Sequence, residues 1–106
     1  MPKYLLQASY TTEGVKGLLK DGGTKRRAAI QQMIGALGGK LESVYFAFGD
    51  ADVYVIADAP DNVSAAALSL TVNASGAASV KTIQLLTPEE IDQATKKTVS
   101  YRAPGS

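Results

Sequence analysis

The residues able to do chemistry are few, and their types narrow the chemistry that they could support. The 106-residue chain contains no cysteine and no histidine, which removes thiolate nucleophiles, thiolate metal sites and the most common general base. Acid–base and binding functions are therefore left to carboxylates, tyrosines, lysines and arginines. The candidate ligand-binding residues are two tyrosines, a basic trio and one aspartate: Tyr10, Tyr54, Lys25, Arg26, Arg27 and Asp52.

The basic trio falls in the first turn of a helix expected over residues 24–37, with Thr24 as its N-cap. Cations at this position oppose the helix dipole, which favours negative charge there. One interpretation is an anion site, in which helix N–H groups and basic side chains hold a carboxylate or a phosphate. The alternative is a solvated turn, or an arginine that braces the hairpin by pairing with Asp52. We expect Asp52 to pair with a basic side chain of the Lys25–Arg27 segment, with Arg27 as the first choice, because the planar fork of an arginine matches a carboxylate.

The glycine and the two aspartates of the hairpin between residues 46 and 53 are more typical of a turn than of a metal site. Asp50 and Asp52 could hold a hard cation such as Mg²⁺, but two carboxylates without further ligands favour ordinary turn chemistry beside Gly49. We therefore expect no metal and no organic cofactor. No P-loop, dinucleotide fingerprint or nucleophile–base pair is present, so the sequence leaves open whether the protein is an enzyme.

The tyrosines allow two interpretations. They could line a cavity for an aromatic or quinone-like ligand, or they could be core rings whose hydroxyls reach the edge of the core. Four of them lie in expected strands: Tyr4, Tyr10, Tyr45 and Tyr54.

Hydrophobic periodicity and turn residues predict the elements that position these side chains. Strands are expected at 3–11, 41–48, 53–58 and 78–86, and helices at 12–20, 24–37, 59–74 and 87–97. The break at Gly22-Gly23 is expected because adjacent glycines are costly inside a helix. Thr87-Pro88 followed by Glu90 predicts a capping box.

This order predicts an α+β, ferredoxin-like βαββαβ fold. The four-stranded antiparallel sheet should have the order 4-1-3-2, with the helices on one face, followed by a C-terminal helix. We expect one domain over residues 1–97 and a loose tail over residues 98–106. In the helix after residue 61 the side chains expected to face the sheet are Val63, Ala66, Ala67, Leu70 and Ala74.

The middle strands are apolar on both faces. Val53, Val55 and Ala57 alternate with Tyr54 and Ile56. In the strand before the hairpin, the expected alternation sets Val44, Phe46 and Phe48 against Leu41, Tyr45 and Ala47. Soluble monomers seldom expose a large apolar face, so we expect a homodimer packed sheet to sheet. The alternative is a terminal helix that folds over the face.

Topology should bring the candidate side chains to one end of the sheet. The first strand ends at Tyr10, and the third starts beside it at Asp52, because the two run antiparallel. The helix over residues 24–37 is about as long as a strand and returns its N-terminus to the same end. Tyr10, Asp50, Asp52, Tyr54 and the basic trio are thus expected to share one rim.

Charge and hydropathy argue against two classes of partner. The formal net charge is +1, although residues 1–40 carry seven basic and two acidic side chains and residues 41–106 carry four and eight. This balance does not predict nucleic-acid binding or a polybasic membrane surface. No stretch approaches the roughly 20 apolar residues of a membrane span, and we expect a soluble cytoplasmic protein.

The chain resembles the GYD domain family, grouped with the dimeric α/β-barrel superfamily, from about Tyr4 to Glu90. The matching stretches are residues 12–19, 27–29, 38–40, 45–49, 52–53 and 59–61. Gly49 and Asp52 match the family's Gly-Tyr-Asp-type signature, and Ala51 stands at its tyrosine position.

The resemblance implies a ferredoxin-like fold and a dimeric α/β barrel. With the residues above, it leads us to expect a small dimeric protein that binds or transforms a small anionic or aromatic molecule. The alternative is a structural or interaction protein whose role is oligomer assembly.

Overall fold

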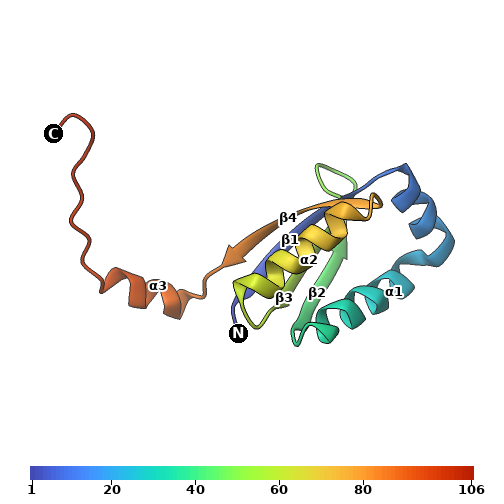
Figure 1. The fold of residues 1–106 in the computed structure, drawn as a ribbon, viewed down its shortest axis with the longest axis horizontal. Coiled ribbons are helices and arrows are strands. Elements are labelled where there is room, and N and C mark those ends of the chain that lie inside the picture. The colour runs from blue at the N-terminus through green and yellow to red at the C-terminus, as the bar shows by residue number, and fades with distance from the viewer.

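The computed structural model describes residues 1–106, and its four strands form one antiparallel sheet covered by two helices (Figure 1). The strand order is β2-β3-β1-β4, which is the predicted order read from the other edge. The βαββαβ order is therefore confirmed. The elements are β1 (Lys3–Tyr10), α1 (Thr12–Ala36), β2 (Lys40–Phe46), β3 (Val53–Asp58), α2 (Asn62–Ala74), β4 (Ala78–Leu85) and α3 (Pro88–Thr95).

A glycine bends α1 where two helices were expected. Gly22 has φ 79° and ψ 172°, which interrupts an otherwise helical run. Only glycine adopts a positive φ of this kind without strain. The predicted break is confirmed, but the helix resumes at once. Thr24 therefore lies in the first turn after the kink and is not the N-cap of a separate helix. Figure 1 shows the two segments of α1, residues 12–21 and 23–36, turned against each other.

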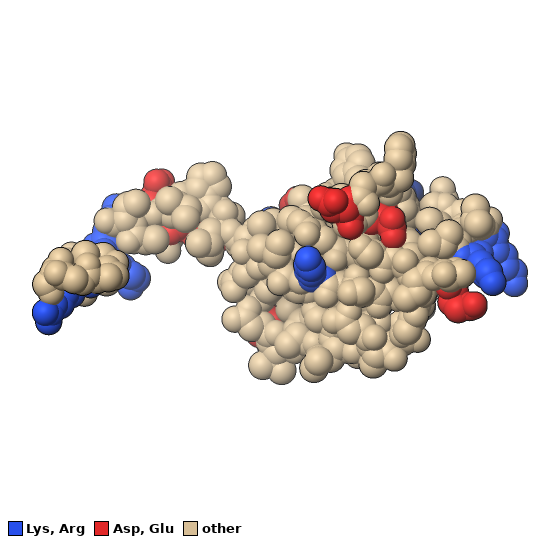
Figure 2. Space-filling model, turned by 90° about the horizontal axis from the view of Figure 1, so that it is seen from above, with Lys and Arg blue, Asp and Glu red and all other residues tan.

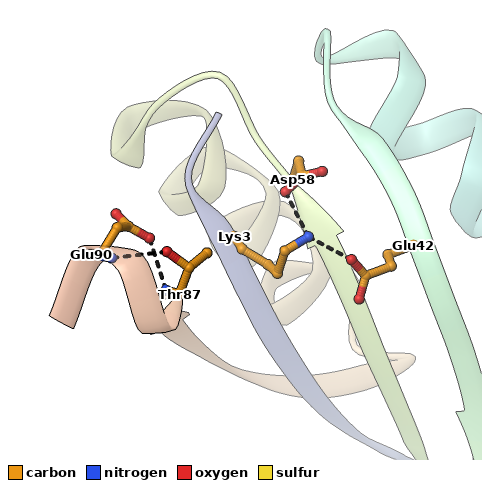
Figure 3. Close-up of polar contacts among 5 residues, drawn as sticks. All are labelled: Lys3, Glu42, Asp58, Thr87 and Glu90. Atoms are coloured by element: carbon orange, nitrogen blue, oxygen red, sulfur yellow. Dashed lines mark hydrogen bonds and ion pairs between the residues drawn. The ribbon is translucent and has the colours of Figure 1, made fainter. Parts of the chain in front are cut away.

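The predicted start of α3 is confirmed. Thr87 Oγ1 accepts a hydrogen bond from the Glu90 N–H at 3.1 Å, and Glu90 Oε1 accepts one from the Thr87 N–H at 2.9 Å (Figure 3). Each side chain satisfies a backbone donor that the helix leaves free, which is the physical basis of a capping box. Asp61 caps α2 in the same way, accepting from the Ser64 N–H at 2.7 Å.

The core lies between the helices and one face of the sheet. The alternation predicted for β3 is confirmed, because Val53, Val55 and Ala57 are all buried. The buried cluster consists of Tyr4, Leu6, Ile30, Ile34, Val53, Val55, Ala57 and Leu68.

The face of α2 that contacts the sheet differs from the predicted one. Leu68 is buried and Ala65 and Val72 pack against the core, whereas Val63 and Leu70 are exposed. Asn73 explains the rotation, because its side chain accepts from the Val80 N–H at 2.7 Å and donates to the Val80 carbonyl at 3.4 Å. The expected inward set now faces solvent: Val63, Ala66, Ala67, Leu70 and Ala74.

The predicted alternation of β2 is also wrong. The ladder with β3 shifts between Leu41 and Ser43, so that Leu41 and Val44 both pack against the core. A bulge adds one residue to a strand and changes which side chains face each side. Phe48 lies beyond the end of β2, in the hairpin loop, and is fully exposed.

The C-terminal residues do not cover the open face of the sheet. After β4 the chain leaves the body, and α3 and the tail project beyond the end of the sheet (Figure 1). No residue of α3 is buried. The alternative in which a terminal helix covers the open face is therefore wrong.

Candidate functional site

Tyr10 and Arg26 meet where β1 ends and the second segment of α1 begins. Arg26 Nε donates a hydrogen bond to the Tyr10 hydroxyl at 3.2 Å, and the guanidinium carbon lies 5.9 Å from the centroid of the ring. Arg26 is half-buried, whereas Lys25 and Arg27 are exposed. Arg26 forms no ion pair, so the four N–H donors of its two terminal nitrogens remain free of any carboxylate.

Tyr10 and Arg26 line a solvent-open cleft between the two segments of α1. Its volume is about 170 Å³. Gly14, Gly17 and Leu18 also line it, and Glu13 and Asp21 are exposed at its rim. The kink at Gly22 shapes this cleft, because it turns the segment that carries Arg26 toward the segment that carries Gly14.

Close backbone packing holds the first segment of α1 in place. A Cβ on Gly14 would lie 2.1 Å from the Ala77 carbonyl oxygen, so only glycine fits there. The Thr11 hydroxyl donates to the Gly76 carbonyl at 2.8 Å. One wall of the cleft is thereby tied to the loop before β4.

The space between the sheet and the helices is nearly filled. Two apolar cavities of about 20 and 40 Å³ remain there. Tyr10 and Arg26 also line the larger one, so this pair separates the core from the outer cleft. A ligand with several polar groups therefore has room outside the pair and not behind it.

The expected ion pair between Arg27 and Asp52 is wrong. The Asp52 carboxylate instead accepts a hydrogen bond from the Tyr10 backbone N–H at 2.7 Å, and neither residue forms a salt bridge. Successive helical residues point about 100° apart, so Arg27 diverges from Arg26 and lines a recess beside β2 with Leu41 and Tyr45. Asp52 thus holds the end of β1 and acts on the cleft only through the backbone of Tyr10.

The candidate residues do not share one rim, because the sheet separates them into two groups. Tyr10, Arg26 and Asp52 come together, but Tyr54 and Asp50 lie in a separate recess of about 240 Å³. This recess is on the open face and is also lined by Gln7, Ser9, Ser79 and Lys81. Lys25 is exposed and forms no side-chain hydrogen bond or ion pair.

The tyrosines do not line one cavity either. Tyr4 and Tyr10 lie on the helix side of the sheet, and Tyr54 lies opposite Tyr45 on the open side. In the signature hairpin Gly49 is exposed, and Ala51, at the tyrosine position, is buried.

An ion-pair cluster that sequence reasoning missed joins three strands. Lys3 Nζ lies 2.6 Å from Glu42 Oε1 and 3.0 Å from Asp58 Oδ1 (Figure 3). The hydrogen bonds to Glu42, and then to Asp58, raise the pKa of Lys3 above its usual 10.5. The pairing of Lys3 with Asp58 in the β1–β3 ladder was the available signal, but the bulge in β2 hid the role of Glu42. These ion pairs connect β1, β2 and β3 at the end of the sheet opposite the cleft.

The structure offers neither a cluster of metal ligands nor a helix that could span a membrane. No group of three or more histidine, cysteine, aspartate or glutamate side chains is placed to hold a metal ion. None of the helices has both the length and the apolar composition needed to cross a membrane.

The fold and the cleft define a class: an α+β protein of ferredoxin-like topology with a solvent-open cleft at the end of its first strand, lined by one arginine and two carboxylates. The chain belongs to the GYD domain family, whose family model matches residues 4–95. The resemblance seen in the sequence is thereby confirmed. A search of curated proteins gave no match.

Proposed function

We propose that this protein binds a small organic anion in the cleft, with Arg26 as the anion-binding residue and Tyr10 as its positioning residue. The observation that carries the proposal is a half-buried guanidinium without a carboxylate partner, oriented by one hydrogen bond. A planar guanidinium offers paired donors that match a carboxylate. Because Nε is used by Tyr10, the terminal nitrogens are left for the ligand.

The cleft favours a small monoanion with an apolar body. Its volume of about 170 Å³ is below the roughly 300 Å³ at which pockets for drug-sized ligands begin. The ring of Tyr10 and the side chain of Leu18 offer apolar contacts. Glu13 and Asp21 at the rim disfavour a dianion such as phosphate by like-charge repulsion. An aromatic or short aliphatic carboxylate fits these conditions, and its binding requires no metal or organic cofactor.

Benzoate is the probe that tests this proposal, with benzyl alcohol as its uncharged counterpart. In NMR titrations we expect saturable shifts of the Gly14, Gly17 and Arg26 amides with benzoate and none with benzyl alcohol. Arg26→Gln should weaken benzoate binding by about tenfold, the equivalent of one charge-assisted hydrogen bond. Lys25→Gln is the matched control and should leave it unchanged. Equal losses in both variants, or no saturable shift, would contradict the proposal.

A second candidate function is oligomer assembly through the open face of the sheet. Leu5 pairs with Ile56 on one side and with Ile83 on the other, and Tyr54 pairs with Tyr45. These side chains form an apolar band that no helix of the same chain covers. A second sheet packed about 10 Å away would bury the band, giving the dimeric α/β barrel. The homodimer is compatible with ligand binding, whereas assembly alone would leave the cleft without a ligand.

Light scattering after size exclusion tests the dimer. At low micromolar concentration we expect about twice the 11.1 kDa chain mass. Ile83→Asp should lower the measured mass relative to the wild type, because it places a charge in the band. Gln84→Asp, at the next residue and on the opposite face of β4, is the control and should stay dimeric. A folded wild-type monomer would exclude this assembly.

A further inference from the structure

The C-terminal arm, residues 86–106, has an apolar side that its own chain leaves unpacked. Ile91 in α3 is 47% exposed and Tyr101 in the tail is 77% exposed, and no residue of α3 is buried. Figure 2 shows the arm meeting the body of the molecule only at a narrow neck. Isolated helices shorter than about 12 residues are marginal in water, and α3 has eight. The capping box alone does not supply the missing packing, so α3 would be stabilised by a surface that covers Ile91.

The same molecule carries an unpartnered apolar helix face. Val63 is 79% exposed and Leu70 is 71% exposed. With three alanines they form the α2 outer face, defined as Val63, Ala66, Ala67, Leu70 and Ala74. Residues 62–80 contain no charged side chain, whereas the solvent side of a surface helix is normally charged or polar. The α2 outer face therefore has the composition of a helix–helix contact.

The two surfaces match in size and chemistry. Thirteen residues of α2 extend over about 20 Å and eight residues of α3 over about 12 Å, so α3 fits along α2. Small alanines allow close approach of a helix, so Ile91 could pack between the exposed side chains of Val63 and Leu70. The acidic first turn of α3, with Glu89 and Glu90, meets no like charge on α2.

We infer that the C-terminal arm packs on the α2 outer face of a second copy of this chain. The arm leaves β4 in a direction that leads away from its own α2 (Figure 1), which makes another copy the accessible partner. Two copies exchanging arms reciprocally form a closed two-fold assembly. The inference depends neither on the ligand cleft nor on the open sheet face, because it uses different residues from both.

Engineered cysteines test the contact directly, because the chain has no native cysteine. Ile91→Cys and Leu70→Cys chains are purified separately, mixed and oxidised. We expect a disulfide-linked pair of chains, at least about fivefold more abundant than with Gln32→Cys in place of Leu70→Cys, since a disulfide needs Cα atoms within about 7 Å. Equal yields with both partners would overturn the inference, as would no cross-link.

The doubly substituted chain, Ile91→Cys with Leu70→Cys, separates exchange from folding back. Exchange gives linked chains in non-reducing gels, whereas a disulfide within one chain would show that the arm packs on its own α2 and would overturn the inference. Hydrogen exchange gives an independent measure. Protection of α3 amides should increase with protein concentration in the wild type and in Gln32→Lys, and should be lost in Leu70→Lys. Concentration-independent protection would contradict the exchange.

Discussion

The Arg26 guanidinium is held by the hydroxyl of Tyr10, through a hydrogen bond of 3.2 Å from Nε. Tyr10 is in turn held by Asp52, whose carboxylate accepts the Tyr10 backbone N–H at 2.7 Å. The aspartate of the signature hairpin therefore supports the arginine through the strand end and a tyrosine side chain, and not through a salt bridge. This chain of contacts leads to the first prediction.

Tyr10→Phe should weaken benzoate binding without unfolding the protein. The ring and its packing are kept, but Arg26 loses the acceptor that orients it. We expect a loss of about three- to tenfold in affinity, the effect of one neutral hydrogen bond, with a small change in the free energy of unfolding. Calorimetric titration and urea unfolding measure the two quantities. Unchanged affinity would show that Arg26 does not need its tyrosine.

Gly22→Ala should destabilise the fold, because φ at this position is 79°. With ψ at 172° this is a backbone region open essentially only to glycine, and it costs a residue with a Cβ about 1–3 kcal/mol. Gly17→Ala is the matched control: Gly17 is helical, with no atom within 4 Å of an added Cβ, and should be neutral or slightly stabilising. Urea unfolding compares the two variants. An unchanged free energy of unfolding in Gly22→Ala would contradict a backbone strain at this position.

The cap of α2 should make stability depend on acid pH. The Ser64 backbone N–H, with its side chain, lowers the pKa of Asp61 below its usual 3.8. A lowered folded-state pKa stabilises the fold above the unfolded-state pKa, and this contribution is lost as pH falls through the lowered value. Asp61→Asn keeps a capping side chain but should show a smaller loss of stability between pH 5 and pH 2 than the wild type. Urea midpoints across this range test the sign, and an identical pH profile would contradict it.

The Lys3 cluster should be visible in an alkaline titration. Hydrogen bonds to Glu42 and Asp58 raise the pKa of Lys3 above 10.5, so the stabilisation is present below that pH and is lost as pH rises through the raised value. Glu42→Gln should bring the pKa of Lys3 closer to 10.5, as followed by NMR of its ε-carbon. Glu89→Gln, a change in the distant arm, is the control. A Lys3 pKa that is the same in all three proteins would contradict the contacts.

Local signals in the sequence were enough for the elements and their order. Gly22, the Thr87–Glu90 capping box and the alternation in β3 act within a few residues, and their physics does not depend on the rest of the fold. Each is confirmed. The strand order follows from right-handed connections between such elements, and the sheet has that order.

The directions of individual side chains were decided by tertiary structure. The α2 sequence is apolar or small on both faces, so its periodicity could not choose between Leu68 and Leu70. The choice is made by Asn73, which binds both backbone groups of Val80. Likewise Arg26 and Arg27 are adjacent in the sequence, and the angle at Gly22 decides which of them meets Tyr10. Sequence alone determined the elements because local energies act between neighbours, whereas the cleft depends on contacts between segments that only the folded chain brings together.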